Sequence, residues 1–191
     1  MASYIFQDLL SKAPMSIRNN VADARSWMQD NVTTVTTNRI LTGDRQRQTD
    51  SVQPGRMYMF NYDPKTKDKL PYYDRFPLIF KVAQVKGGFT GLNMHYLPHR
   101  LRAKLMDALY DTTNNKKYDE TTRLRMTYQT LQAATKYKWF KPTFKQYLTS
   151  QVRSRFIEVS PSEWDIALFL PVEAFEKSRK TSVWSDSRNA I

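Results

Sequence analysis

Side-chain types alternate most clearly just after residue 50. Within Arg56–Tyr62, Met57 and Met59 alternate with three aromatic residues, and a period of two is typical of a β-strand. Asp63-Pro64 follows and ends the strand, because proline has no N–H to donate to a ladder. The pattern therefore predicts one strand that ends at a turn.

Three further strands are predicted later in the chain. Pro77–Val85 and Phe89–Met94 are runs of strand-forming residues, and Lys86-Gly87-Gly88 between them is a hairpin signal. Arg153–Val159 is the last strand candidate. Together these segments predict a small, mainly antiparallel sheet.

Helical periodicity begins where the hairpin ends. Pro98 suits the first turn of a helix, since its missing N–H would have no partner there. The apolar stripe of this predicted helix consists of Leu101, Leu105, Ala108 and Leu109. Asp119 is placed to cap a second helix, whose predicted inward residues are Leu124, Tyr128 and Leu131. Lys136–Lys145 is then expected to be a basic and aromatic turn, and Thr143–Ser150 a short helix.

The clearest local signal is Ser160-Pro161-Ser162-Glu163. Serine at the N-cap, proline at the first helical position and glutamate at the third form a capping box, so a short helix through Trp164 is predicted. A further helix is expected over Val172–Lys180, and residues 181–191 are interpreted as a tail.

The first part of the chain has a different character. Residues 3–12 are predicted to form a short helix, and residues 16–28 a second helix capped by Ser16. Residues 31–53 are polar and predict a linker or an arm that orders only on a partner. We therefore expect an N-terminal helical arm with its linker over residues 1–53 and a single domain over residues 54–191.

The fold class that these segments predict is α+β. A small antiparallel sheet is expected to carry a mostly helical, basic C-terminal half and a helical N-terminal arm. The chain has 191 residues, which fits one domain with an extension.

Composition removes several classes of site. The chain has no cysteine, which excludes a disulfide framework, a thiol nucleophile and a cysteine-based zinc site. It has five glycines, and none lies in a phosphate-loop pattern. No apolar run approaches the roughly 20 residues that cross a bilayer. We expect no cofactor, no membrane partner and no small-molecule substrate.

Positive charge is concentrated in one third of the chain. The net charge is +12, and residues 97–157 contain thirteen basic and four acidic residues, a net charge of +9. Clustered cations attract phosphate, so we expect double-stranded DNA as a partner, bound without sequence preference. A solvated cationic face or an acidic partner protein is the alternative.

No residue pattern predicts catalysis. His95 and His99 are four residues apart, but Pro98 interrupts the helix that would bring them together on a metal. Asp63, Asp68 and Asp74 could hold Mg²⁺ for a nuclease, although turn chemistry and nearby lysines explain them better. We expect a protein that is not an enzyme.

The candidate DNA contacts are the cations of the basic segment, some of them interleaved with aromatic residues, an arrangement that suits a phosphate backbone. They are Arg100, Arg102, Lys104, Lys116, Lys117, Arg123, Arg125, Lys136, Lys138, Lys141, Lys145, Arg153 and Arg155. Tyr58, Phe60, Tyr62 and Phe76 are expected in the core, whereas Tyr72 and Tyr73 are candidates for contact with a partner.

Four segments also resemble a known group of proteins. They are MYMFNYDPKTKDKLPYYDRFPLIF, GLNMHYLPHRLRAKLMDALY, SEWDIALFLPVEAFEK and VWSDSR. Over roughly residues 54–190 the chain resembles short virion proteins of T4-like tailed phages, including cyanophages, in the family of the DNA end protector. This resemblance implies a head-completion component that is bound at the ends of the packaged genome and shields them from exonuclease.

The resemblance also implies a location and partners. The protein would be assembled into the virion in the host cytoplasm, beside other virion proteins. The alternative is a structural component of the tail or baseplate that binds only other virion proteins, in which case the cations would face acidic protein surfaces.

Overall fold

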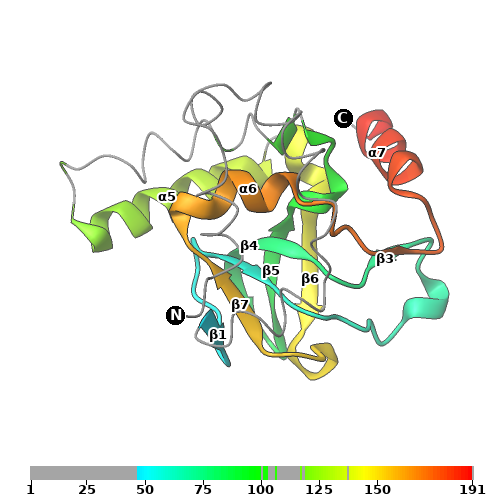
Figure 1. The fold of residues 1–191 in the computed structure, drawn as a ribbon, viewed down its shortest axis with the longest axis horizontal. Coiled ribbons are helices and arrows are strands. Elements are labelled where there is room, and N and C mark those ends of the chain that lie inside the picture. Colours follow the sequence, from blue (N-terminus) through cyan, green and yellow to red (C-terminus); the bar gives the residue numbers. More distant parts are fainter. Residues whose placement is uncertain are drawn as a thin grey trace, which may run out of the picture.

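The structure of the chain is a computed structural model, which describes residues 47–99, 101–102, 106, 117, 119–136 and 138–190. The helices predicted over 3–12 and 16–28, most of the polar linker and most of the helix predicted after Pro98 lie outside the described residues. The described part has the predicted α+β class, with a six-stranded sheet and helices beside it (Figure 1).

All pairings in the large sheet are antiparallel, as predicted, and the strand order is β1-β7-β2-β4-β5-β6. The strands are β1 (Gln48–Thr49), β2 (Met57–Met59), β4 (Leu78–Val85), β5 (Gly88–Asn93), β6 (Phe144–Leu148) and β7 (Phe156–Val159). The predicted strands over 56–62, 77–85, 89–94 and 153–159 are therefore confirmed, with β2 and β7 shorter than expected.

Met57 and Met59 of β2 point to one face of the sheet, and Tyr58 points to the other. Both faces are buried, so alternation in this strand separates two cores rather than a core from solvent. On the first face, the methionines pack with Leu78 and Phe80 of β4. The helices α5 (Glu120–Lys136) and α6 (Trp164–Phe169) cover this face.

The starts of both helices follow the predicted chemistry. Asp119 accepts a hydrogen bond from the backbone N–H of Thr122 (2.9 Å), which caps α5. The capping box at Ser160 is present and opens a short 3₁₀ turn, η7 (Pro161–Glu163), that leads into α6. Trp164 then packs edge-on against Phe80 at a ring-centroid distance of 4.9 Å.

The second face of the sheet is aromatic and strongly curved. Its buried residues are Tyr58, Phe60, Tyr62, Ile79, Phe89, Tyr147 and Phe156. Phe89 of β5 and Phe156 of β7 lie 5.7 Å apart between ring centroids, although β4 and β2 separate their strands. Three strand spacings span about 14 Å in a flat sheet. The sheet must therefore bend around these rings, and Phe60 fills the centre of the concave face.

Glycine is needed where β5 meets β6. A Cβ atom on Gly88 would lie 1.9 Å from the backbone oxygen of Tyr147. The preceding Gly87 has a φ of 75° in the hairpin turn, which fits the predicted turn at this position.

Three predictions in the C-terminal half are wrong. Residues 144–148 form strand β6, not a helix, because each of them pairs with a residue of β5 between Gly88 and Leu92. Residues 172–179 are not helical, and β8 (Phe175–Glu176) within them pairs with β3 (Tyr73–Asp74). Part of the expected tail is a helix, α7 (Lys180–Asn189), which buries Val183 and Ser187.

The short β3–β8 sheet and α7 lie together beyond the edge of the large sheet that β6 forms (Figure 1). Tyr72 contacts the rings of Tyr96 and Phe175, and Trp184 of α7 donates a hydrogen bond to the carbonyl of His95 (2.8 Å). The remaining short turns in the described residues are η3 (Lys67–Lys69), η4 (Met94–Tyr96), η5 (Lys138–Thr143) and η6 (Thr149–Gln151). At the other side of the sheet, β1 pairs with β7, so the end of the expected linker belongs to the sheet.

Candidate nucleic-acid interface

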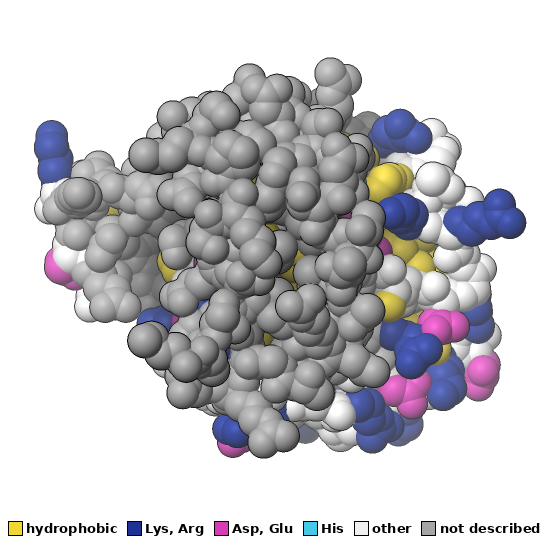
Figure 2. Space-filling view, viewed as in Figure 1, with side chains coloured by type: hydrophobic (Ala, Val, Ile, Leu, Met, Phe, Trp, Pro, Cys, Tyr) yellow, Lys and Arg dark blue, Asp and Glu magenta, His cyan; other side chains and the backbone are white. Residues whose placement is uncertain are grey.

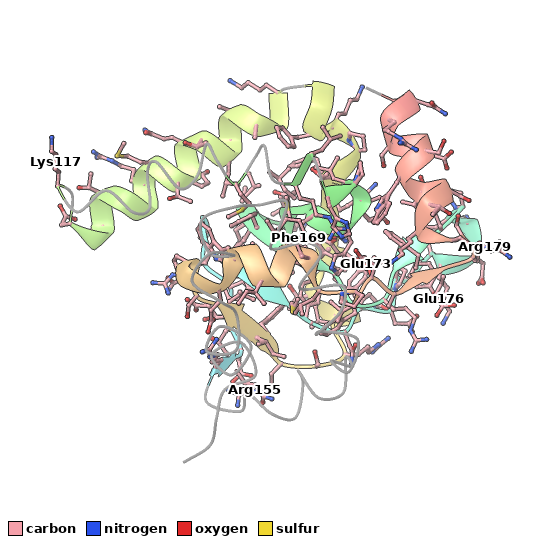
Figure 3. The ribbon with its side chains drawn as sticks, turned by 45° about the horizontal axis from the view of Figure 1, so that its top comes forward. Lys117, Arg155, Phe169, Glu173, Glu176 and Arg179 are labelled. Carbon is pink, nitrogen blue, oxygen red and sulfur yellow. The ribbon has the colours of Figure 1, made fainter. Side chains whose placement is uncertain are left out.

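The expected DNA-binding cations do not form one patch in the described part of the chain. Lys117, Arg125, Lys136 and Lys141 are exposed before, along and after α5. Arg155 pairs with Asp50 (2.8 Å). Figure 3 shows Lys117 at the outer end of α5 and Arg155 at a different edge of the molecule. The residues or side chains that lie outside the described part are Arg100, Lys104, Lys116, Arg123 and Lys138.

Arg102 has a different surrounding from the one expected, because its side chain is completely buried. Its guanidinium donates to the carbonyls of Leu97 (2.7 Å), His95 (3.3 Å) and Leu168, and to the carboxylate of Glu173 (2.7 Å). A cation held in this way cannot reach a phosphate at the surface. Arg102 therefore leaves the set of candidate DNA contacts and joins the core.

The carboxylate of Glu173, labelled in Figure 3, is buried beside Arg102. Burial alone would raise the pKa of Glu173, but the neighbouring His95 and the Arg102 guanidinium lower it to about 2. Burial in turn lowers the pKa of Arg102. We call the group of Arg102, Glu173 and the carbonyls that Arg102 contacts the Arg102 centre.

A hollow of about 470 Å³ lies between the loop after β2 and strand β6. Five tyrosines and two lysines contribute to its wall, and we call it the tyrosine pocket. These residues are Tyr62, Tyr72, Tyr73, Tyr96 and Tyr147, with Lys65 and Lys145.

Lys145 is the unusual member of the pocket. Its ammonium lies 4.1 Å from the centroid of the Tyr96 ring, a cation–π geometry. Burial lowers the pKa of Lys145. Among the described residues, no carboxylate lies within ion-pair distance of its Nζ. The pocket therefore contains a half-buried cation that no described anion compensates.

A buried hydrogen-bond network centred on Asp74 lies at the wall of the pocket. The carboxylate of Asp74 is buried and accepts from Phe76 N–H (3.0 Å), from Ala174 N–H (3.3 Å) and from the Asn93 amide (3.1 Å), and it bonds His95 Nδ1 (2.7 Å). The same Asn93 amide donates to the Tyr147 hydroxyl (3.1 Å). The carboxylate is thus occupied by its own neighbours, and the Tyr147 hydroxyl is held by the same network.

A second hollow of about 500 Å³ adjoins the pocket, because Tyr62 and Tyr73 line both. We call it the charged groove. Its charged residues are Asp63, Lys67, Arg75, Arg153 and Glu176. Arg75 pairs with Glu176 (2.8 Å), and Arg153 lies 3.8 Å from Asp63. On the side where Figure 1 places β3 and α7, Figure 2 shows Lys and Arg side chains mixed with Asp, Glu and hydrophobic ones.

Sequence reasoning reached only part of this site. Lys145, Arg153, Tyr72 and Tyr73 were candidates and do line the two hollows, but Tyr62, Tyr96, Tyr147 and Lys65 were not proposed as contacts. Lys145 and Tyr147 face the same pocket because they are two residues apart on a strand. Because a helix was predicted over this segment, the shared orientation of Lys145 and Tyr147 was missed. The two aromatic residues of the segment, Phe144 and Tyr147, were the available signal for a strand.

The residues considered for metal binding have structural surroundings. His95 is buried against Asp74, and Asp63 pairs with Lys67 (3.1 Å). Among the described residues, no three His, Cys, Asp or Glu side chains are grouped as a metal ion would require. No helix in the described ranges is long and apolar enough to span a membrane.

Comparison with known proteins identifies one family. The family described as "Phage T4 terminal DNA protecting protein" matches residues 7–187, which includes most of the expected N-terminal arm as well as the domain. No curated protein and no solved structure gives a match. Since the family match spans nearly the whole chain, the chain belongs to the family of the phage T4 terminal DNA protecting protein.

Proposed function

We propose that this protein is a non-enzymatic component of a phage virion that binds the ends of packaged double-stranded DNA and shields them from exonuclease. The family to which the chain belongs is described by protection of terminal DNA. The observation in the fold that supports the proposal best is the uncompensated Lys145 in an aromatic pocket beside a groove with three further cations.

Binding is proposed to be independent of sequence. The cations of the charged groove and of α5 suit phosphate oxygens, which carry no sequence information. We also propose a part in head completion together with other virion proteins, after assembly in the host cytoplasm. The predicted arm would supply contacts to those proteins.

An exonuclease-protection assay tests the proposal. Linear duplex DNA should be degraded more slowly in the presence of the protein, and unlabelled linear DNA should compete for the protein better than closed circular DNA of the same sequence. Affinity should fall with salt, by a log–log slope of about −0.9 for each phosphate neutralised.

Each other outcome has a definite meaning. Equal competition by circular DNA would contradict end binding. Absence of any binding at low salt would contradict a DNA partner and favour the tail or baseplate alternative. Strand cleavage that requires Mg²⁺ and disappears in Asp63→Ala or Asp74→Ala would contradict a non-enzymatic role.

A further inference from the structure

We infer that the tyrosine pocket binds the terminal nucleotide of a DNA strand, with its base against the tyrosine rings and its phosphate against Lys145. This inference rests on the proposed function, because it explains how a sequence-independent protein can distinguish an end from the interior of a duplex.

The first argument concerns charge. An ammonium that is taken out of water costs free energy unless an anion or a hydrogen-bond acceptor compensates it. Arg102 shows how this fold compensates a buried cation, with three carbonyls and the carboxylate of Glu173. Among the described residues, Lys145 has only the face of Tyr96. A ligand phosphate in the pocket would supply the missing anion.

The second argument concerns the tyrosine rings that line the pocket. Tyrosine rings offer flat apolar faces on which any base can stack, which gives affinity without sequence preference. Tyr72 and Tyr73 are half-buried, so part of each ring remains available. A hollow of about 470 Å³ lies within the range of about 300–1,000 Å³ that holds small organic ligands, and one nucleotide belongs to that size class.

The third argument concerns the rest of the strand. The charged groove continues from the pocket past Tyr62 and Tyr73 and presents Lys67, Arg75 and Arg153. Their carboxylate partners form exposed pairs, which contribute little to stability and can exchange for phosphate. The next phosphates of the same strand could therefore lie along this groove.

End selectivity follows from the geometry of a duplex. A base must leave the helical stack before it can enter a pocket, and this costs a few kcal/mol for a paired interior base but least for one that is already unpaired. The last base pair has stacking on one side only. A pocket for one unstacked nucleotide therefore selects the end of a strand.

Linear duplexes that lack the base at a terminal nucleotide test the inference directly. One set carries the abasic residue at the 5′ ends, a second set at the 3′ ends, and a third set ten base pairs from the ends. Affinity should fall by roughly tenfold or more in one terminal set, the loss expected for one stacked base, and should be unchanged in the third set.

Two variants connect the effect to the pocket. Lys145→Met keeps most of the length of the side chain and removes its charge, and Tyr73→Leu removes a half-buried ring. Each should abolish the difference between intact and abasic ends while binding to circular DNA is retained. Lys141→Met is the matched control, since it removes an exposed lysine outside the pocket and should leave the difference intact.

Two results would overturn the inference. They are equal affinity for intact and abasic ends, and an equal loss of discrimination in Lys141→Met and Lys145→Met. If the protein still prefers linear over circular DNA in these cases, the proposed function stands and only the pocket is excluded. If that preference is missing from the unaltered protein, the proposed function itself fails.

Discussion

Arg102 and Lys145 are both cations withdrawn from water, but their surroundings differ. In the Arg102 centre, the guanidinium meets Glu173 and three carbonyls and lies 5.6 Å from the ring centroid of Trp184. In the tyrosine pocket, the ammonium of Lys145 meets one ring and no carboxylate of the described residues. Arg102 links His95 and Leu97, which precede α6 in the chain, to Glu173, which follows it, so it stabilises the fold.

Lys145 forms no such link between segments of the described residues. A half-buried charge without an anion lowers stability, and its presence in a hollow open to a ligand is typical of a binding site that is maintained at some cost to the fold. Under the proposed function, compensation by an anion, rather than burial, separates the structural cation Arg102 from the proposed binding cation Lys145. Four substitutions test this contrast between the two cations.

Arg102→Met should have the largest effect. The substitution leaves the buried Glu173 carboxylate without its cation, and loss of one partner of a buried ion pair costs about 3–5 kcal/mol. Urea unfolding at pH 7 measures the change in the free energy of unfolding. A loss below 1 kcal/mol would mean that the centre does not stabilise the fold, and the comparison would fail.

Acid should weaken the Arg102 centre specifically. The pKa of Glu173 is lowered to about 2 from an ordinary 4.5, so its contribution is complete above pH 4.5 and is lost as the pH falls toward 2. This difference corresponds to roughly 3 kcal/mol of stability. Unfolding curves between pH 7 and pH 2.5 should show the decline, and Glu173→Gln should flatten this part of it. A slope that is identical in the variant would contradict the assignment.

Asp74→Asn tests the hydrogen-bond network that connects the Arg102 centre to the tyrosine pocket. Asp74 bonds His95, whose carbonyl accepts from Arg102, and also Asn93, which holds the Tyr147 hydroxyl in the pocket. An amide cannot accept all of these hydrogen bonds, so we expect a loss of about 2 kcal/mol in the free energy of unfolding. Exonuclease protection should decline in parallel. Unchanged stability would show that the two regions are independent.

Lys145→Met should have the smallest effect on stability, and of opposite sign. Removal of an uncompensated cation should leave the free energy of unfolding unchanged or raise it by up to about 1 kcal/mol. Thermal unfolding without DNA measures this directly. If the variant is less stable by more than 1 kcal/mol, the lysine has a structural role and the contrast with Arg102 disappears.

Local patterns predicted much of this fold. The alternation at Met57 and Tyr58 identified β2, the two glycines identified the β4–β5 hairpin, and the capping box identified the start of α6. Each of these signals depends on residues close together in the chain, where steric and hydrogen-bonding preferences act directly.

The failures have a common cause. Residues 144–148 form a strand because β5 offers them a partner edge, and Phe175 is in a strand because Asp74 lies beside it. The sequence around Arg102 gives no sign of Glu173, which is 71 residues away. The candidate site was therefore predictable as a charge excess with tyrosines, but not as a pocket, since its wall is assembled from distant segments.

The place of β7 in the sheet has a consequence for folding kinetics. β7 lies between β1 and β2, and it pairs Phe156 with Thr49 and Val159 with Met57. Pairings between such distant residues form slowly, because a long loop must close first. During synthesis, the edge of β2 stays unpaired until residue 159 has left the ribosome. The concave aromatic face, and the pocket at its rim, can thus be completed only after most of the chain has been made.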